Sequence, residues 1–323
     1  MARILTGIQS SGRQHLGNIL GAIRPAIDLA CDPKNDSFLF IADMHSLTSL
    51  KDGAIRKENI RATAAAWLAC GLDPERTVFY LQSDIPQVAA MTWYLSCFTP
   101  FPMLANAHSF KDKSENLSDV NAGLFVYPVL MACDILMYDA DIVPVGKDQK
   151  QHLEMTRDMA RSVNYHYKKD VFVIPESKID EDVMVIPGTD GRKMSKSYNN
   201  HIDIFLPEKK LRKQIMGIIT DSKGLNDVKD PDTCNVFALY SLLAGDDQKA
   251  EMRKNYSSGN YGYGHAKIAL FELIMDQFRT EREKFDKFMA EPDHIDSILK
   301  KGAEKARPVA DQVLKRFKAE LGF

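Results

Sequence analysis

The chain lacks the features of a membrane, secreted or highly charged protein. No apolar run in its 323 residues approaches the roughly 20 that a membrane helix needs, and the N-terminus has no basic segment followed by an apolar one. Its 42 basic and 44 acidic residues nearly cancel, giving a net charge of −2, which excludes a polybasic nucleic-acid arm and an acidic tail. We therefore expect a soluble, cytoplasmic globular protein that needs no membrane partner.

Paired cysteines are also missing. The five cysteines are scattered singly along the chain, at Cys31, Cys70, Cys97, Cys133 and Cys234. Without C-x-x-C spacing, neither a zinc ribbon nor an iron–sulfur loop has its ligands. Disulfide frameworks belong to small secreted chains. The sequence therefore predicts five reduced thiols, no structural zinc and no iron–sulfur cluster.

In the first part of the chain, short apolar runs alternate with segments whose apolar residues recur at helical spacing. Strands are expected at 3–8, 37–42, 77–82 and 141–145, and helices at 17–31, 55–70 and 149–162. Such alternation predicts an α/β fold, with a right-handed parallel sheet covered by helices on both faces. Beyond about residue 200 almost every segment has a period of 3.6. We expect an α-helical second domain there, with the seam between about 185 and 205.

A glycine-rich segment, Gly7-Ile8-Gln9-Ser10-Ser11-Gly12-Arg13-Gln14-His15-Leu16-Gly17-Asn18, connects the first expected strand to the first helix. Ligands of α/β sheets bind at this carboxyl edge, and glycines let a phosphate approach the backbone. Arg13-Gln14 stands where a P-loop requires Lys-Ser/Thr, and no G-x-G-x-x-G fingerprint is present. The segment alone indicates a phosphate site or an ordinary strand–helix loop.

A second candidate is Lys193-Met194-Ser195-Lys196-Ser197, preceded by the glycine-containing segment 187–192. Two ammonium groups and two hydroxyls on one loop can bind a polyphosphate. A solvated turn is the alternative interpretation for any loop of this composition.

Taken together, these segments resemble the two signatures of class I aminoacyl-tRNA synthetases. Lys193–Ser197 reads KMSKS, and His15–Asn18 resembles the HIGH tetrapeptide in a relaxed form. The segments 127–136 (YPVLMACDIL) and 143–152 (VPVGKDQKQH) resemble the amino-acid pocket helix and the VPVGxDQxQH stretch of bacterial-type tryptophanyl-tRNA synthetases. The likeness covers essentially the whole chain. Ser10 departs from it, because the family usually has proline there.

The resemblance implies a fold and a reaction. The fold is a Rossmann-like doubly wound catalytic domain over 1–198, ending in the KMSKS loop, and an α-helical tRNA (anticodon)-binding domain over 199–323, in a homodimer. The reaction joins L-tryptophan to tRNA(Trp) through a tryptophanyl-adenylate, with ATP as substrate. No protein nucleophile is needed, because positioning and charge neutralisation supply the rate. Mg²⁺ is expected on the ATP phosphates, since no carboxylate cluster resembles an all-protein cage.

The resemblance also implies the roles of individual residues. For the adenosine and phosphates it gives Gln9, Ser10, Ser11, Gly17 and Asn18, with His15 donating to phosphate, and for ribose and adenine Gly146, Lys147 and Asp148. For the β and γ phosphates it gives Lys193, Met194, Ser195, Lys196 and Ser197, with Lys113 reaching the same groups unless its loop is simply solvated. For tryptophan it gives Tyr127 and Gln149 at the α-ammonium, Met131 in the pocket, and Asp134 at the indole.

Asp134 bears on the choice of amino acid. An indole offers one N–H donor and no acceptor, so a buried carboxylate is a suitable partner. A tyrosine hydroxyl both donates and accepts, so Asp134 alone does not separate the two substrates. Tyrosyl-tRNA synthetase is therefore the nearest alternative. A small-molecule nucleotidyltransferase is disfavoured by the intact KMSKS loop and the long helical tail. A catalytically silent RNA-binding relative is disfavoured because no motif residue that matters is missing.

Overall fold

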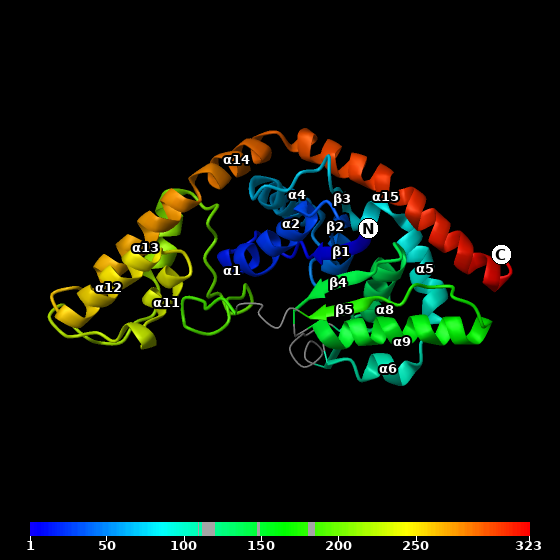
Figure 1. Ribbon diagram of the computed structural model, residues 1–323, viewed down its shortest axis with the longest axis horizontal. Coiled ribbons are helices and arrows are strands. Elements are labelled where there is room, and N and C mark those ends of the chain that lie inside the picture. The colour runs from blue at the N-terminus through cyan, green and yellow to red at the C-terminus, as the bar shows by residue number, and fades with distance from the viewer. Residues whose placement is uncertain (109, 112–119, 147–148, 180–184) are drawn as a thin grey trace.

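A five-stranded parallel sheet forms the centre of the fold (Figure 1). The computed structural model describes residues 1–108, 110–111, 120–146, 149–179 and 185–323. The strands are β1 (Ala2–Ile8), β2 (Asn35–Ile41), β3 (Val78–Leu81), β4 (Ile142–Val145) and β5 (Glu176–Ile179). Their order is β3-β2-β1-β4-β5, with every neighbouring pair parallel. The order reverses between β1 and β4, and the carboxyl ends of these two strands are where such a sheet binds ligands.

The predicted Rossmann-like α/β fold is confirmed, and four of the strands lie where the sequence placed them. The fifth strand, β5, was not predicted. Its sequence, ESKI, is short and polar, and it pairs only with β4 at the edge of the sheet. An edge strand needs no apolar residues on both faces, so the hydrophobic pattern that reveals a central strand is absent.

Helices connect the strands and build the rest of the molecule. In the sheet-containing part they are α1 (Leu16–Asn18), the π-helical η1 (Ile19–Ile23), α2 (Arg24–Cys31), α3 (Asp43–Ser46), α4 (Gly53–Ala69), η2 (Gln82–Asp84), α5 (Pro86–Ser96), α6 (Phe101–Ala105), α8 (Ala122–Leu136) and α9 (Lys150–Tyr167). After residue 200 they are α10 (Glu208–Met216), η4 (Pro231–Thr233), α11 (Asn235–Ser241), α12 (Asp246–Ser258), α13 (Tyr263–Gln277), α14 (Arg279–Ala290) and α15 (Pro292–Leu321). Within the described part of the chain, no helix has the length and apolar character to cross a membrane.

Apolar side chains are buried on both faces of the sheet, as expected for a sheet covered by helices on both sides. Leu39 and Ile41 point to the face covered by α2 and α4, where Trp67 is buried. Phe38 and Phe40 point to the opposite face, which α5, α8 and α9 cover. Successive side chains of a strand alternate between faces, so this one segment contributes to both apolar layers and fixes the register of the central strands.

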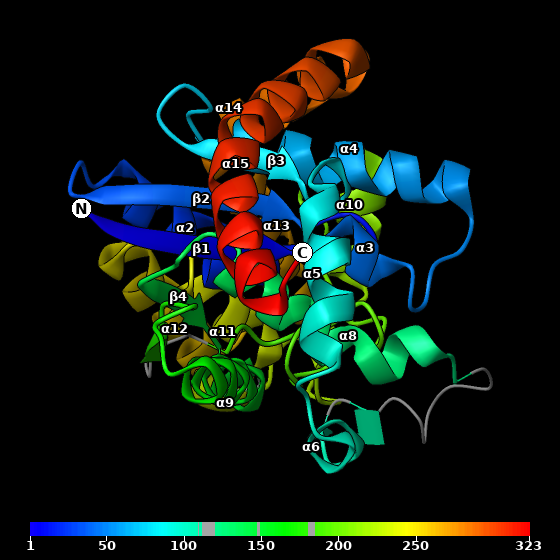
Figure 2. The same cartoon turned by 90° about the vertical axis from the view of Figure 1, so that its right-hand side faces the viewer.

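The last helix, α15, returns to the sheet from the helical lobe, which is formed by helices α10 to α14. Figure 1 shows α14 and α15 arching from α13 across the top of the molecule, and Figure 2 shows α15 in front of the sheet. Ala303, Ala306, Val313 and Phe317 of α15 share the apolar cluster of Phe38. Residues 292–321 therefore pack with the sheet although they follow the helical lobe in sequence. The domain limits of 1–198 and 199–323 stay a prediction.

Gly302 allows α15 to approach the sheet backbone. A Cβ there would lie 1.7 Å from the carbonyl oxygen of Phe79 in β3. Gly302→Ala must push the helix off the strand, and we expect it to lower the free energy of unfolding by about 1–3 kcal/mol, measured by urea titration. The matched control is Gly264→Ala in α13, whose added Cβ would meet nothing within 4 Å, and which should be at least as stable as the wild type. Equal stability of the two variants would contradict this packing.

Candidate active site

The two signature segments touch at the carboxyl edge of β1. The backbone N–H of Gly17 donates to the sulfur of Met194 at 3.3 Å. The ammonium of Lys196 donates to the carbonyl oxygen of Gly12 at 2.8 Å. Gly12 has φ +144°, a conformation that L side chains rarely adopt, and its backbone lies against the Lys196 side chain. The structure thus brings together the segments predicted to bind the phosphates of ATP.

His15 is held as a neutral hydrogen-bond donor at the start of α1. Its Nδ1 accepts from the backbone N–H of Asn18 at 3.2 Å, and the Asn18 side chain accepts from the His15 N–H at 3.2 Å. Because Nδ1 accepts, the proton of the neutral ring resides on Nε2. Burial, followed by the charges of Lys196 and His201, lowers the pKa of His15 to about 4. His15 can therefore offer Nε2–H to an anion at neutral pH.

Asn200 organises the KMSKS loop, a role the sequence reasoning missed. Its side-chain oxygen accepts from the Ser195 N–H at 2.7 Å, and its amide donates to the carboxylate of Asp190 at 2.7 Å and to the carbonyl oxygen of Lys193 at 3.1 Å. The Ser195 and Ser197 hydroxyls lie 2.7 Å apart. Asparagine is a common turn residue, and this preference was the only signal in the sequence for the role of Asn200. Buried Asn200 fixes the backbone of a loop whose Lys193 side chain is exposed.

Lys196 differs from an ordinary surface lysine. Burial lowers its pKa to about 8, and the carboxylate of Asp203 opposes that change. The hydrogen-bond partner of its ammonium, the Gly12 carbonyl, carries no charge. A largely protonated ammonium therefore stands at the contact of the two segments, beside His15.

The remaining residues predicted for ATP have different surroundings. Ser10, which stands where the family usually has proline, is buried with its hydroxyl 3.1 Å from that of Ser46. Gln9 and Ser11 on either side of it are exposed. Gly146 follows β4, and its carbonyl oxygen accepts from the Gln149 N–H at 2.9 Å. The predicted residues Lys113, Lys147 and Asp148 lie outside the described residues.

Asp134 is buried in a network of donors. Its two carboxylate oxygens accept from the side-chain amide of Gln82 at 2.7 and 2.8 Å, and Nε2 of His45 lies 2.8 Å from one of them. Burial raises the pKa of Asp134, while the hydrogen bonds from His45 and Gln82 oppose that rise. Sequence reasoning missed both partners. Gln82 follows β3 at the carboxyl edge of the sheet, and that position was the signal that could have found it.

Two of the other residues predicted for tryptophan, Tyr127 and Met131, share helix α8 with Asp134. Tyr127, Met131 and Asp134 follow one another along one face of α8 at spacings of four and three residues. The hydroxyl of Tyr127 lies 2.6 Å from Nε2 of His152 in α9, and its ring meets the ring of His45 edge to face, with centroids 5.5 Å apart. The side chains of Tyr127 and Asp134 are therefore held by neighbouring elements.

Helix α3 connects the two halves of the site. His45 contacts Asp134, and the adjacent Ser46 contacts Ser10 in the turn after β1. Helix α3 thus contacts both the Asp134 network and the turn after β1 that leads to Gly12.

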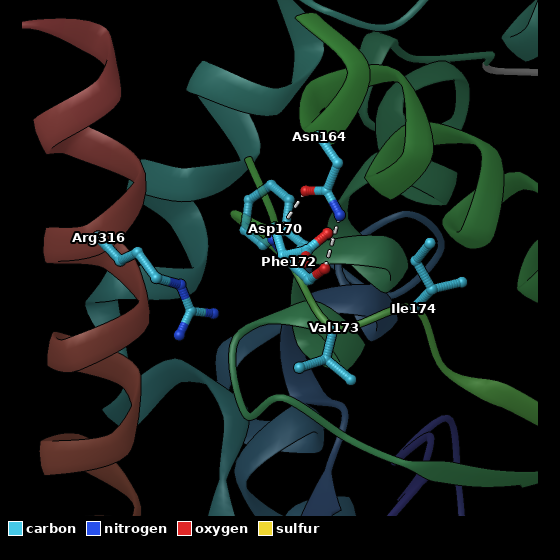
Figure 3. Close-up of a pocket in the computed structure, with 6 residues that line it drawn as sticks. All are labelled: Asn164, Asp170, Phe172, Val173, Ile174 and Arg316. Atoms are coloured by element: carbon cyan, nitrogen blue, oxygen red, sulfur yellow. Dashed lines mark hydrogen bonds between the residues drawn. The ribbon is translucent and has the colours of Figure 1, made fainter. Parts of the chain in front are cut away.

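Two cavities lie elsewhere and contain none of the predicted site residues that the structure describes. One, of about 330 Å³, lies between the end of α9 and α15 (Figure 3). Its Asn164 bonds the backbone of Phe172, and its Arg316 pairs with Asp139. The other, of about 340 Å³, lies in the helical lobe beside Tyr263. The side chains of Asn164 and Arg316 in the first cavity thus already have protein partners.

No metal cage is evident in the part of the chain that the structure describes. There, no three His, Cys, Asp or Glu side chains come together in a way that could hold an ion. The five cysteines are free, and Cys133 and Cys234 are buried.

Comparison with known proteins identifies the family. The family described as tRNA synthetases class I (W and Y) matches residues 1–279. The tryptophan–tRNA ligase of Campylobacter jejuni (strain RM1221) is 46% identical over 321 residues, 99% of this chain and 100% of that protein. The ligase of Fusobacterium nucleatum is 46% identical over 323 residues, covering 100% and 98% of the two chains.

The solved structures agree with this relation and with the predicted resemblance. The crystal structure of C. jejuni tryptophanyl-tRNA synthetase complexed with ADP and tryptophan matches with a TM-score of 0.94 at 46% identity, covering 99% of this chain and 100% of that one. The tyrosyl-tRNA synthetase of Archaeoglobus fulgidus, with a TM-score of 0.64 and 19% identity, shares the fold. The chain therefore belongs to the class I tRNA synthetases for tryptophan and tyrosine, and within them to the tryptophan–tRNA ligases.

Proposed function

We propose that the site at the carboxyl edge of β1 and β4 carries out both steps of an ATP-dependent tryptophan–tRNA ligase. In the first step the carboxylate of L-tryptophan attacks the α-phosphorus of ATP, and pyrophosphate leaves. In the second the 3′-terminal ribose hydroxyl of tRNA(Trp) attacks the carbonyl carbon of the adenylate, and AMP leaves. The observation that carries the proposal is the contact of Lys196 with Gly12, because it places a cation between the two signature segments.

The phosphates of ATP bind to His15 and to Lys193–Ser197 in this proposal. The Nε2–H of His15 and the ammonium of Lys196 supply donors that are already oriented, and such donors stabilise charge that develops on a leaving group. Gln9, Ser10, Ser11, Gly17, Asn18 and Gly146 contact the rest of the nucleotide. Lys113, Lys147 and Asp148 have the roles that the family resemblance implies. Mg²⁺ is held mainly by the phosphates, which suits a site without a protein cage in the described residues.

Tryptophan binds with its indole at Asp134 and its α-ammonium at Tyr127 and Gln149, beside Met131. One carboxylate oxygen of Asp134 accepts a single hydrogen bond from Gln82, and such an oxygen can accept a second. The donors His45 and Gln82 keep the carboxylate in one orientation, so the indole N–H meets a fixed acceptor. This arrangement suits the indole, and the choice of tryptophan over tyrosine rests on the similarity to the tryptophan–tRNA ligases.

The remaining assignments concern partners and location. The sheet domain over 1–198 is catalytic, and the helical domain over 199–323 binds the anticodon part of tRNA(Trp). A second copy of the chain covers the surface of α5 and α6, where Trp93 and Phe101 are 71% and 70% exposed. Large aromatic side chains this exposed favour a protein interface. The enzyme works in the cytoplasm, where tRNA is charged.

Charging of tRNA tests the proposal. With ATP, radiolabelled tryptophan and a tRNA(Trp) transcript, we expect tryptophanyl-tRNA to form with one AMP released for each tryptophan attached. The control pair, tyrosine with tRNA(Tyr), should remain uncharged. Charging of tRNA(Tyr) with tyrosine instead would establish the tyrosyl alternative, and release of AMP without any charging would contradict the second step.

A further inference from the structure

His201 is a second histidine beside the phosphate-binding segments, and no signature motif includes it. It directly follows Asn200, whose hydrogen bonds fix the KMSKS loop. The carbonyl oxygen of the next residue, Ile202, accepts from the backbone N–H of Leu16 at 2.8 Å. The chain on either side of His201 is therefore tied to both signature segments, and its imidazole is held within the site.

The imidazole of His201 lies next to that of His15. The ring centroids are 5.9 Å apart with an interplanar angle of 41°. Nδ1 of His201 is buried and finds no hydrogen-bond partner among the described residues. A buried polar atom without a partner is costly, and a hydrogen bond with a bound ligand would remove that cost.

The charges around His201 favour an anion. Lys196 of the KMSKS loop and His15 of the first turn contribute positive or potentially positive groups. The facing acid is Asp203, and Arg13 already pairs with it at 2.6 Å. Burial, together with the charge of Lys196, lowers the pKa of His201, while Asp203 opposes the change. The ring is therefore neutral in the free enzyme at neutral pH and has one unused nitrogen.

We propose that His201 is a further phosphate-binding residue, which completes a group of three with His15 and Lys196 and takes up a proton when ATP binds. A polyphosphate a few ångströms away favours the charged form of an imidazole, and the protonated ring donates from both nitrogens. This inference rests on the proposed function, because it assigns His201 to the ATP site of that reaction.

Calorimetric titration of the full-length protein with ATP tests the inference without requiring turnover. In two buffers of different ionisation enthalpy at about pH 7, wild type should take up a fraction of a proton that His201→Gln does not. The variant should bind ATP about 10-fold more weakly at about pH 6 and about 3-fold more weakly at about pH 8, because a charged donor is lost at low pH and a neutral one at high pH. The terminal phosphate of ATP also titrates in this pH range, so the variant is compared with wild type at each pH.

Two further variants separate phosphate binding from a structural role. His201→Lys restores a permanent cation and should recover ATP affinity without the pH dependence. His294→Gln, on α15, where His294 stacks on Phe288, should match wild type. Tryptophan affinity should be unchanged in all three. Proton uptake and ATP affinity in His201→Gln equal to those of wild type would overturn the inference, as would an equal loss of ATP and tryptophan binding. Absence of tRNA charging by an enzyme that behaves as expected here would instead contradict the proposed function.

Discussion

Replacing Lys196 by alanine is expected to slow tryptophanyl-adenylate formation by about 10²–10³-fold, the usual effect of losing one electrostatic stabiliser. The Lys196 ammonium is half-buried and donates to the Gly12 carbonyl, so it is oriented before the substrate arrives. Its charge is needed most when negative charge builds on the departing pyrophosphate. Tryptophan affinity should stay within about twofold of wild type, because the ammonium stabilises a charge that tryptophan alone does not carry.

The pH profile gives a second readout of the same group. The pKa of Lys196 is lowered to about 8 in the free enzyme, so kcat/KM for ATP should fall as the pH rises through that value and the ammonium loses its proton. This alkaline limb should be absent from Lys196→Ala and moved to higher pH in Lys196→Arg. The matched control is Lys209→Ala on the exposed surface of α10. Unchanged exchange kinetics in Lys196→Ala would contradict the assigned role.

Asp134→Ala is expected to lower kcat/KM for tryptophan, while ATP binding stays near that of wild type. The substitution leaves the indole N–H without an acceptor in a buried pocket. That penalty is about 1–3 kcal/mol for a neutral donor, and more where the lost partner is charged. It also removes the acceptor of Gln82 and His45. Asp134→Asn should be less harmful, because its amide oxygen still accepts.

A tryptophan analogue with sulfur in place of the indole N–H isolates this hydrogen bond. A site built around a substrate hydrogen bond rejects an analogue that lacks it by up to ~10⁴–10⁵. The wild-type enzyme should therefore discriminate strongly against the analogue, and Asp134→Ala only weakly. Thermal unfolding and ATP titration check that the variant is folded. If wild-type enzyme uses both compounds equally well, Asp134 is not the partner of the indole.

The sequence predicted the parts of the fold that depend on local pattern. The run of β2 is apolar at successive positions because both faces of the strand are buried, so it was recognisable. The polar edge strand β5 had no such pattern. The return of α15 to the sheet also had no local signal, because its apolar stripe shows that a partner exists without showing which one. Gly302, which permits that contact, is an ordinary glycine in the sequence.

The same limit applies to the site. The two signature segments were recognisable because their residues are adjacent in sequence. The partners of Asp134 are 89 and 52 residues away from it, at His45 and Gln82, and each is a single polar residue without a motif. Asn200 and His201 follow the KMSKS signature but do not belong to it. The packing of α3, η2 and the segment after the KMSKS loop against their neighbours gives these residues their positions.

ATP–pyrophosphate exchange, measured for the wild-type enzyme with tryptophan and with tyrosine as the only amino acid, tests the central claim most directly. The exchange requires the carboxylate of the amino acid and the phosphates of ATP to meet in one site, and it does not depend on tRNA. We expect rapid exchange with tryptophan, which stops when ATP or the amino acid is omitted, and little exchange with tyrosine. Exchange driven by tyrosine, or exchange without an amino acid, would contradict the account.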